Sequence, residues 1–323
     1  MELNSNIDKS LDKIQRTVQF FRILFAVTKR SLIVDFRYKF QLVVEAAWTA
    51  INVLVFVLLG AAWQETAEPT GVPYTMVSFF IIATGFFTVF SGVMETTVTA
   101  ISEENQLGTM GFLVTNSVSP VAIIIGRYLS ATVRWLVILF VIVIPPLLLR
   151  GLYPLTWELF WAAWVVFLIA WIFFLGFTLI LTSISLIFKR TTTFNRVGIY
   201  IVRFAAGAFV PINSFDNSVK IFGKPLSHYL IYFPPALALE ALRWIFTVNS
   251  AEELSCQTCP ESRDGIDYSS FSSIFGVGVK NFTFSDPIIQ QMLLIVLICF
   301  AISVLLVGRL TTIARAWGTI EFY

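Results

Sequence analysis

The chain has 323 residues, of which 57% are hydrophobic and only 13% are charged, and its mean hydropathy is +0.81. A water-soluble domain of this length could not bury so much apolar surface, so the composition excludes that class and predicts an integral membrane protein. The formal net charge of +2 is too small to indicate nucleic acid as a partner.

Residues 12–38 repeat apolar side chains at helical spacing among basic residues. This pattern predicts an amphipathic helix on the inner surface of the bilayer, within a cytoplasmic N-terminal region covering residues 1–39. The alternative is a helix that packs on a cytoplasmic domain, but the chain has no polar segment on that side large enough to form one.

A transmembrane helix needs about 20 predominantly apolar residues to cross roughly 30 Å of hydrocarbon. Six segments fit, and they are Phe40–Trp63, Pro73–Met94, Pro120–Leu149, Trp157–Phe188, Val197–Pro211 and Pro287–Val307. The fifth of these is short and contains Arg203. We expect an all-α integral membrane protein with six transmembrane helices, the first five within residues 40–212, preceded by the amphipathic interfacial helix.

The basic residues predict the orientation of these spans. Eight Lys and Arg residues precede the first span, whereas the next loop carries Glu65 and Glu68 and no basic residue. Because positive charge accumulates in cytoplasmic loops, the N-terminus is expected in the cytoplasm. With six spans, the C-terminus is also cytoplasmic, and residues 287–323 contain the last span and a cytoplasmic tail. We expect the protein to lie in the plasma membrane.

Residues 213–286 form the one large polar excursion on the outer side. Its first half is too apolar for a solvated loop, and prolines such as Pro234 and Pro235 break it too often for a span. Irregular backbone cannot face lipid without unsatisfied hydrogen bonds, so we expect re-entrant outer helices between spans five and six.

An inner segment, EENQLGTMGFLVTNSVSPVAIIIGR at residues 103–127, resembles the type-2 ABC exporter permeases, which move drugs, polysaccharides and lipids outward. The matching positions are Glu103, Glu104, Gly108, Thr109, Leu113, Ser119, Pro120, Gly126 and Arg127. A second match is AAGAFVPINSF followed by YFPPALALEALRW, which is similar to the family's fifth span and to its outer re-entrant motif at Pro234, Pro235, Glu240 and Arg243. The two matches occur in the family's order, and the resemblance extends across nearly the whole chain.

The resemblance implies a short inner coupling helix at about residues 100–118, seated in a cleft of a cytoplasmic ABC ATPase. Contact would be made around Gly108 to Leu113, including Phe112, and Pro120 would fix the entry of the following span. The chain has no G-x-x-x-x-G-K-[ST] motif, so we expect no ATPase activity or cofactor in the chain itself. ATP and Mg would bind to the partner.

The family also implies a second permease as a partner, either another copy of this chain or a homologous one. The sequence departs from the family in two places. Residues 105–118 carry no charge, which predicts a more apolar contact with the ATPase, and the segment 247–285 is longer than usual.

Four ionisable residues, Glu45, Glu95, Arg134 and Arg203, are predicted to lie within the spans. A charge in the bilayer costs at least about 2.5 kcal/mol unless it is paired or hydrated. Our hypothesis pairs Glu45 with Arg203 and Glu95 with Arg134, and a proton relay is the alternative.

Cys256 and Cys259 form a C-x-x-C in the outer segment, where a local disulfide or free thiols are the two interpretations. The single histidine, His228, does not indicate a metal site. The function predicted is therefore a permease subunit of an ATP-driven exporter. A secondary transporter or channel is the alternative, although no internal repeat supports it, and no cluster of catalytic residues indicates an enzyme.

Overall fold

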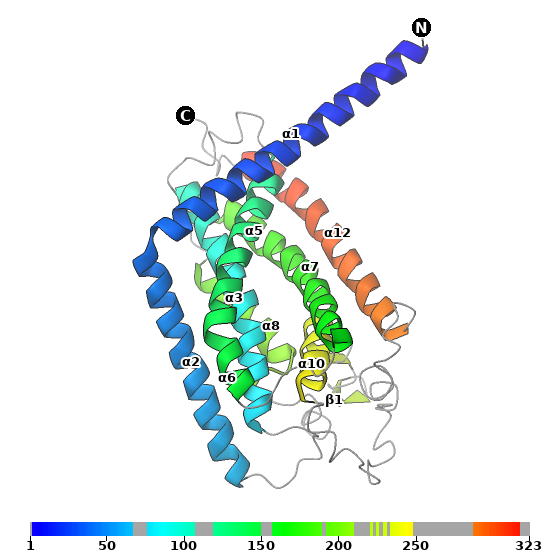
Figure 1. The fold of residues 1–323 in the computed structure, drawn as a ribbon. Coiled ribbons are helices and arrows are strands. Elements are labelled where there is room, and N and C mark those ends of the chain that lie inside the picture. The colour runs from blue at the N-terminus through cyan, green and yellow to red at the C-terminus, as the bar shows by residue number, and fades with distance from the viewer. Residues whose placement is uncertain are drawn as a thin grey trace.

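The computed structural model describes residues 2–66, 76–106, 119–149, 157–188, 192–209, 220–221, 224–225, 229–230, 233–247 and 287–316. Within these ranges the chain is almost entirely helical (Figure 1). The strands in the described part are β1 (Lys220–Ile221) and β2 (Lys224–Pro225), which pair antiparallel.

Five helical segments in the described part are long and apolar enough to cross a membrane. They are α2 (Lys39–Thr66), α3 (Met76–Gln106), α5 (Pro120–Ile138) with its continuation, α7 (Trp157–Ile187) and α12 (Pro287–Ala316). These match the first four predicted spans and the last. The chain is a largely helical, multi-pass membrane protein.

The third span changes its helical register on the way across. Pro120 occupies the first turn of α5, after Ser119 in extended conformation, as predicted. A π-helical turn, η1 (Leu139–Val143), follows and leads into α6 (Ile144–Leu149). Pro145 and Pro146 lack the N–H groups that would continue regular α-helical bonding, which gives a physical reason for a π turn at this point.

The first helix, α1 (Glu2–Arg37), crosses the same end of the bundle that contains the C-terminal end of α12 (Figure 1). It breaks at Tyr38, where the chain turns into α2. Gly126 of α5 makes the crossing close, because a Cβ there would lie 2.9 Å from Val27 Cγ1 and 3.2 Å from Leu24 O. A long helix lying across the ends of the spans is the arrangement that an interfacial helix requires.

The predicted fifth span is shorter than expected. Helix α8 (Thr192–Ala205) has 14 residues, or roughly 21 Å, against the roughly 30 Å of a hydrocarbon core. It ends at Ala205 instead of continuing to Pro211, because Gly207 adopts a left-handed φ of 71°. The Gly207 N–H donates to Phe204 O and the Ala208 N–H to Arg203 O, which is the bonding of a Schellman motif.

Helices α7 and α12 lie side by side and run in the same direction (Figure 1). Gly176 allows this packing, since a Cβ there would lie 3.1 Å from Ser303 Oγ and 3.3 Å from Phe300 Cα. Further along, Leu179 and Leu186 share a buried cluster with Val307. Because both helices run in the same direction, α12 begins at the same end of the bundle as α7.

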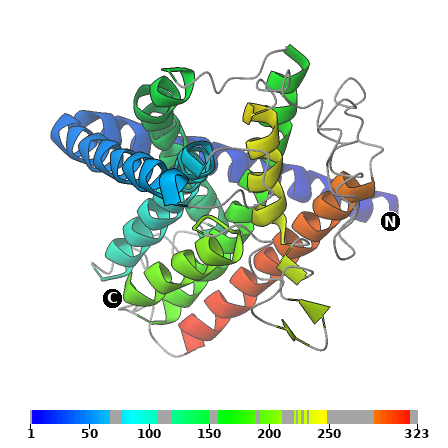
Figure 2. The same cartoon turned by 90° about the horizontal axis from the view of Figure 1, so that it is seen from below.

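Helix α3 forms the centre of the bundle, with 89% of its most apolar stretch buried, whereas only 11% of the corresponding stretch of α2 is buried. Aromatic rings fill the contact between α3 and α7, and the rings of Phe90 and Phe174 stack with centroids 4.4 Å apart. Viewed from below, α3 is surrounded by the other helices (Figure 2). The outer faces of α2 and α12 are apolar and exposed.

Candidate functional site

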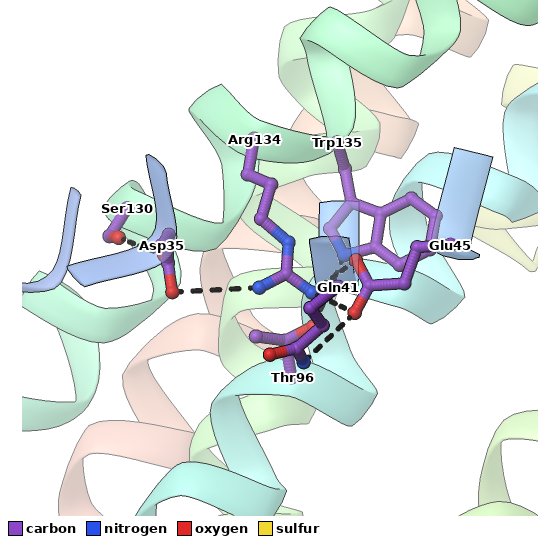
Figure 3. A network of polar contacts seen from close by, with 7 residues as sticks. All are labelled: Asp35, Gln41, Glu45, Thr96, Ser130, Arg134 and Trp135. Atoms are coloured by element: carbon purple, nitrogen blue, oxygen red, sulfur yellow. Dashed lines mark hydrogen bonds and ion pairs between the residues drawn. The ribbon is translucent and has the colours of Figure 1, made fainter. Parts of the chain in front are cut away.

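A network of charged side chains joins α1 and α2 to the third span (Figure 3). Arg134 of α5 donates through Nη2 to both carboxylate oxygens of Glu45, in the second turn of α2. Its Nη1 lies 3.5 Å from Oδ1 of Asp35, in the last turn of α1. The Arg134 side chain is only 6% exposed. One buried cation therefore holds carboxylates on both sides of the Tyr38 break.

Neighbouring polar groups fix both carboxylates. Ser130, one turn before Arg134, donates to Asp35 Oδ2 at 2.9 Å, and Gln41 Nε2 donates to Glu45 Oε1 at 3.2 Å. Both bonds supply donors to the carboxylate oxygens, which a buried ion pair needs if it is to offset its desolvation cost. The bend between α1 and α2 is consequently held in one geometry relative to α5.

Trp135, the residue after Arg134, connects α5 to α3 close to this network (Figure 3). Trp135 Nε1 donates to Thr96 Oγ1 at 3.1 Å. The indole ring lies directly against Gly92, where a Cβ would come within 2.2 Å of the ring. Any side chain larger than glycine at this position would displace the tryptophan.

The pairing hypothesis was wrong in its partners. Glu45 pairs with Arg134 instead of Arg203, and Glu95 pairs with Arg196 at 3.0 Å through side chains that are 48% and 68% exposed. The reason is lateral packing: α2 lies against η1 and α3, while α8 contacts α3. Arg203 does approach α2, but at Phe56, which lies roughly 16 Å further along that helix than Glu45 at about 1.5 Å per residue.

Asp35 is the member of the network that the sequence analysis missed. It lies in the segment predicted to be interfacial, and that prediction rests on the basic and apolar residues of the segment. One signal was available, because Asp35 is the only acidic residue between Lys13 and Val44. An isolated acid in a basic helix indicates a specific partner.

The acidic pair of the predicted coupling segment lies on a spanning helix. Helix α3 continues beyond Met94 to Gln106, so Glu103 and Glu104 occupy its last turns instead of a separate inner element. Residues 95–106 contain no glycine or proline that would end a helix earlier. Residues 107–118, with Gly108, Thr109, Phe112 and Leu113, lie outside the described residues.

An ion pair connects the two ends of that segment. Glu104 Oε1, near the end of α3, accepts a hydrogen bond from Arg127 Nη2 of α5 at 2.6 Å, and both side chains are largely buried, with 17% and 21% exposed. Glu103 is exposed. The segment 107–118 is therefore attached at both ends to helices that are locked together.

The predicted outer motif forms α10 (Pro234–Thr247), which begins at the two prolines. Arg243 is fully buried and donates to Glu240 Oε2 at 3.0 Å and to Gly207 O at 2.9 Å. Its guanidinium lies 3.6 Å from the centroid of the Phe79 ring. The arginine thus connects α10 to the turn after α8 and to the beginning of α3.

Arg203 is surrounded by phenylalanine rings. Its guanidinium carbon lies 5.6 Å from the ring centroid of Phe56, 5.8 Å from that of Phe87 and 5.0 Å from that of Phe209. In the part of the chain that the structure describes, no carboxylate pairs with it, and its buried Nε has no hydrogen-bond partner.

A separate apolar cavity of about 140 Å³ lies between α3, the η1 region, α7 and α10. Its lining includes Gly85, Val143, Trp164 and Phe167, none of which carries a charge. The aromatic rings of this lining come from the second, third and fourth predicted spans and from α10.

Among the described residues, no group of three or more His, Cys, Asp or Glu side chains could hold a metal ion. Cys256 and Cys259 lie outside those residues. No protein-family model matches the chain, and no curated protein or solved structure is significantly similar to it.

Proposed function

We propose that the chain is the membrane-spanning permease subunit of an ATP-driven exporter, powered by a separate cytoplasmic ATPase that contacts residues 107–118. Support comes from the resemblance of residues 103–127 to type-2 ABC permeases and from the multi-pass helical fold. The observation that carries the proposal most is the Glu104–Arg127 ion pair. It meets the mechanical requirement that the contact segment move as one body with the spans.

The remainder of the bundle supports force transmission from that segment. Arg127 lies one residue from Gly126, where α1 rests on α5, and two turns further along α5 Arg134 holds both α1 and α2. A displacement of the beginning of α5 would therefore move α1, α2 and α3 together. In this mechanism an ATPase dimer closes, two contact segments approach each other, and the two permeases change the side to which their pathway opens.

We infer that α8 begins a sixth crossing. It runs antiparallel to α3. Arg196 pairs with Glu95, and further along α8 Arg203 lies against Phe87. After the end of α8, Gly207 O accepts a hydrogen bond from Arg243, which lies on the ring of Phe79. These levels of α3 are roughly 24 Å apart at about 1.5 Å per residue. Together with the same-sense crossing of α7 and α12, this favours an even number of crossings with both termini on the cytoplasmic side, as the positive charges predict.

Copurification tests the proposal. The tagged full-length chain, extracted from its own host in a mild detergent, is expected to bring down a polypeptide with a Walker A motif. Replacement of residues 107–113 of the contact segment by a Gly-Ser stretch of equal length should abolish recovery of that polypeptide without changing the elution volume of the permease. Recovery of no nucleotide hydrolase from intact membranes would favour a transporter or channel that is not coupled to ATP.

A further inference from the structure

Arg203 stands apart from the other intramembrane cations of the described chain. Arg134, Arg196 and Arg243 each have a carboxylate partner. Arg203 has three phenylalanine rings around it and, in the described ranges, no acid within ion-pair distance. The acids of the neighbouring helices bind other cations, because Glu45 binds Arg134, Glu95 binds Arg196 and Glu240 binds Arg243.

Aromatic rings compensate such a charge only in part. A guanidinium gains from the faces of nearby rings, but the rings offer no oxygen that would accept hydrogen bonds from its N–H groups. The buried Nε of Arg203 has no partner among the described residues, but Arg134 and Arg243 share this feature. What distinguishes Arg203 from those two is the lack of a described carboxylate, and a bound anion would supply the missing charge.

The surroundings indicate what kind of anion this is. A hollow of about 440 Å³ on the exposed flank of α8 does not include Arg203 in its lining, so the apolar surface next to the guanidinium is that of the phenylalanine rings. Phe56 and Phe209 add apolar surface beside the guanidinium itself. A small hydrated anion would gain nothing from these surfaces, whereas the apolar body of an amphiphile would.

We propose that Arg203, with the rings of Phe56, Phe87 and Phe209, is a binding site for the anionic head of an amphipathic molecule. A phosphate, sulfonate or carboxylate would accept hydrogen bonds from the fork of N–H donors, which matches such groups better than a lysine does. The apolar body would lie against the rings of Phe56 and Phe209. The role of this site in transport rests on the proposed function, and it names anionic amphiphiles as the substrate class, but binding itself can be measured on the chain alone.

Equilibrium binding of radiolabelled dodecyl phosphate to the immobilised full-length chain in dodecyl maltoside tests the proposal. The wild-type chain should bind it saturably. Arg203→Gln should weaken binding at least roughly tenfold, as expected for loss of a charge-assisted hydrogen-bonded pair. Arg203→Lys, which keeps the charge but not the fork, should lie between the two. Arg196→Gln on the same helix is the matched control and should bind like wild type.

Competition identifies the chemistry and the source of the ligand. Dodecyl sulfate should displace dodecyl phosphate, and dodecyltrimethylammonium should not. Displacement by phosphatidylglycerol but not by phosphatidylcholine supports the site with a lipid headgroup as the anion, whereas displacement by dodecyl sulfate alone supports it with a smaller amphiphile. Equal displacement by inorganic phosphate would overturn the requirement for an apolar body.

The proposal is overturned if the wild-type chain does not bind dodecyl phosphate, or if Arg203→Gln and Arg196→Gln lose affinity equally. If Arg203→Gln does not elute as a folded monodisperse protein, Arg203→Lys and Phe209→Ala carry the test, and unchanged affinity in both contradicts it. This outcome is independent of the proposed function, because failure to recover an ATPase leaves the binding measurement intact.

Discussion

Arg134 and Glu45 come from different spans and form a buried ion pair to which Asp35, on the far side of the Tyr38 bend, contributes a second carboxylate. The pair is the point at which α1, α2 and α5 meet. Removal of the cation would leave two carboxylates facing each other in a poorly hydrated place, so its effect is expected to exceed that of ordinary surface ion pairs.

Arg134→Gln is expected to lower the free energy of unfolding by about 3 kcal/mol, toward the lower end for a broken buried pair because both carboxylates are partly exposed. Thermal and denaturant unfolding in detergent measure this loss. Arg196→Gln, which breaks the exposed pair with Glu95, is the matched control and should cost less than about 1 kcal/mol. Equal losses in the two variants would show that the Arg134 network is not a structural clamp.

A double-mutant cycle isolates the pair itself. Glu45→Gln combined with Arg134→Gln should be less destabilising than the sum of the single changes, with a coupling of about 1–3 kcal/mol. Asp35→Asn should show a smaller coupling to Arg134→Gln, because Asp35 lies farther from the guanidinium and also binds Ser130. Additive effects for Glu45 and Arg134 would contradict the contact.

Gly126→Leu is expected to push α1 away from α5, because even a Cβ there lies within 3 Å of Val27. The measurable result is faster proteolysis within α1 and a loss of about 1–3 kcal/mol of stability. Gly308→Leu on α12 is the matched control, since a Cβ at that position has no neighbour within 4 Å. The double variant Gly126→Ala with Val27→Ala should be protected from proteolysis better than Gly126→Leu, because the smaller side chain at position 27 makes room for the new Cβ. Unchanged proteolysis and stability in Gly126→Leu would refute the close crossing.

Arg243→Gln should weaken the attachment of α10 to the bundle, since Arg243 bonds to Gly207 O and covers Phe79. We expect a loss of about 3 kcal/mol or more. Glu240→Gln removes one partner of Arg243 but keeps the bond to Gly207, so it should cost clearly less. Unfolding followed by intrinsic fluorescence distinguishes the two, and a milder effect for Arg243→Gln than for Glu240→Gln would contradict the assignment.

The transmembrane arrangement can be checked by cysteine labelling in intact cells. Ser5→Cys and Thr312→Cys should resist a membrane-impermeant maleimide until the cells are opened, because both ends are predicted to be cytoplasmic. Thr247→Cys, at the end of α10, should react from outside. Labelling of Ser5→Cys and Thr312→Cys from opposite sides of the membrane would contradict a sixth crossing.

Much of the fold was predictable from the sequence because apolar run length directly measures what can cross a bilayer. Five spans follow from this criterion, and Pro120 marks the start of one because proline tolerates only the first turn of a helix. The second span was predicted to end at Met94, but α3 extends to Gln106, because no glycine or proline ends the helix between these residues.

The partners of the charged residues could not be predicted in the same way. Hydropathy places a residue at a depth but does not say which helix lies beside it, so the pairing of Glu45 with Arg134 required the packing of α2 and α5. The end of α8 depended on Gly207 adopting a positive φ, which several glycines in the chain could have done. The ring of phenylalanines around Arg203 comes from three separate segments.

The Glu104–Arg127 pair is predicted to stabilise the attachment of the contact segment. Glu104→Arg and Arg127→Glu should each reduce substrate-stimulated ATP hydrolysis by the assembled complex, while the doubly exchanged variant should recover a large part of it. Glu103→Arg is the control, because Glu103 is exposed. If the double exchange were no better than either single one, the pair would not be the link between segment and spans.

The central claim is that an ATPase contacts residues 107–118, and site-directed cross-linking tests it most directly. A cysteine at Leu113, in an otherwise cysteine-free chain, should form a cross-link through a short bifunctional maleimide to a nucleotide-binding polypeptide, and ATP should change its yield. A cysteine at Thr247 should form none. Absence of a cross-linked nucleotide-binding polypeptide at position 113, or an equal yield at position 247, would contradict the account.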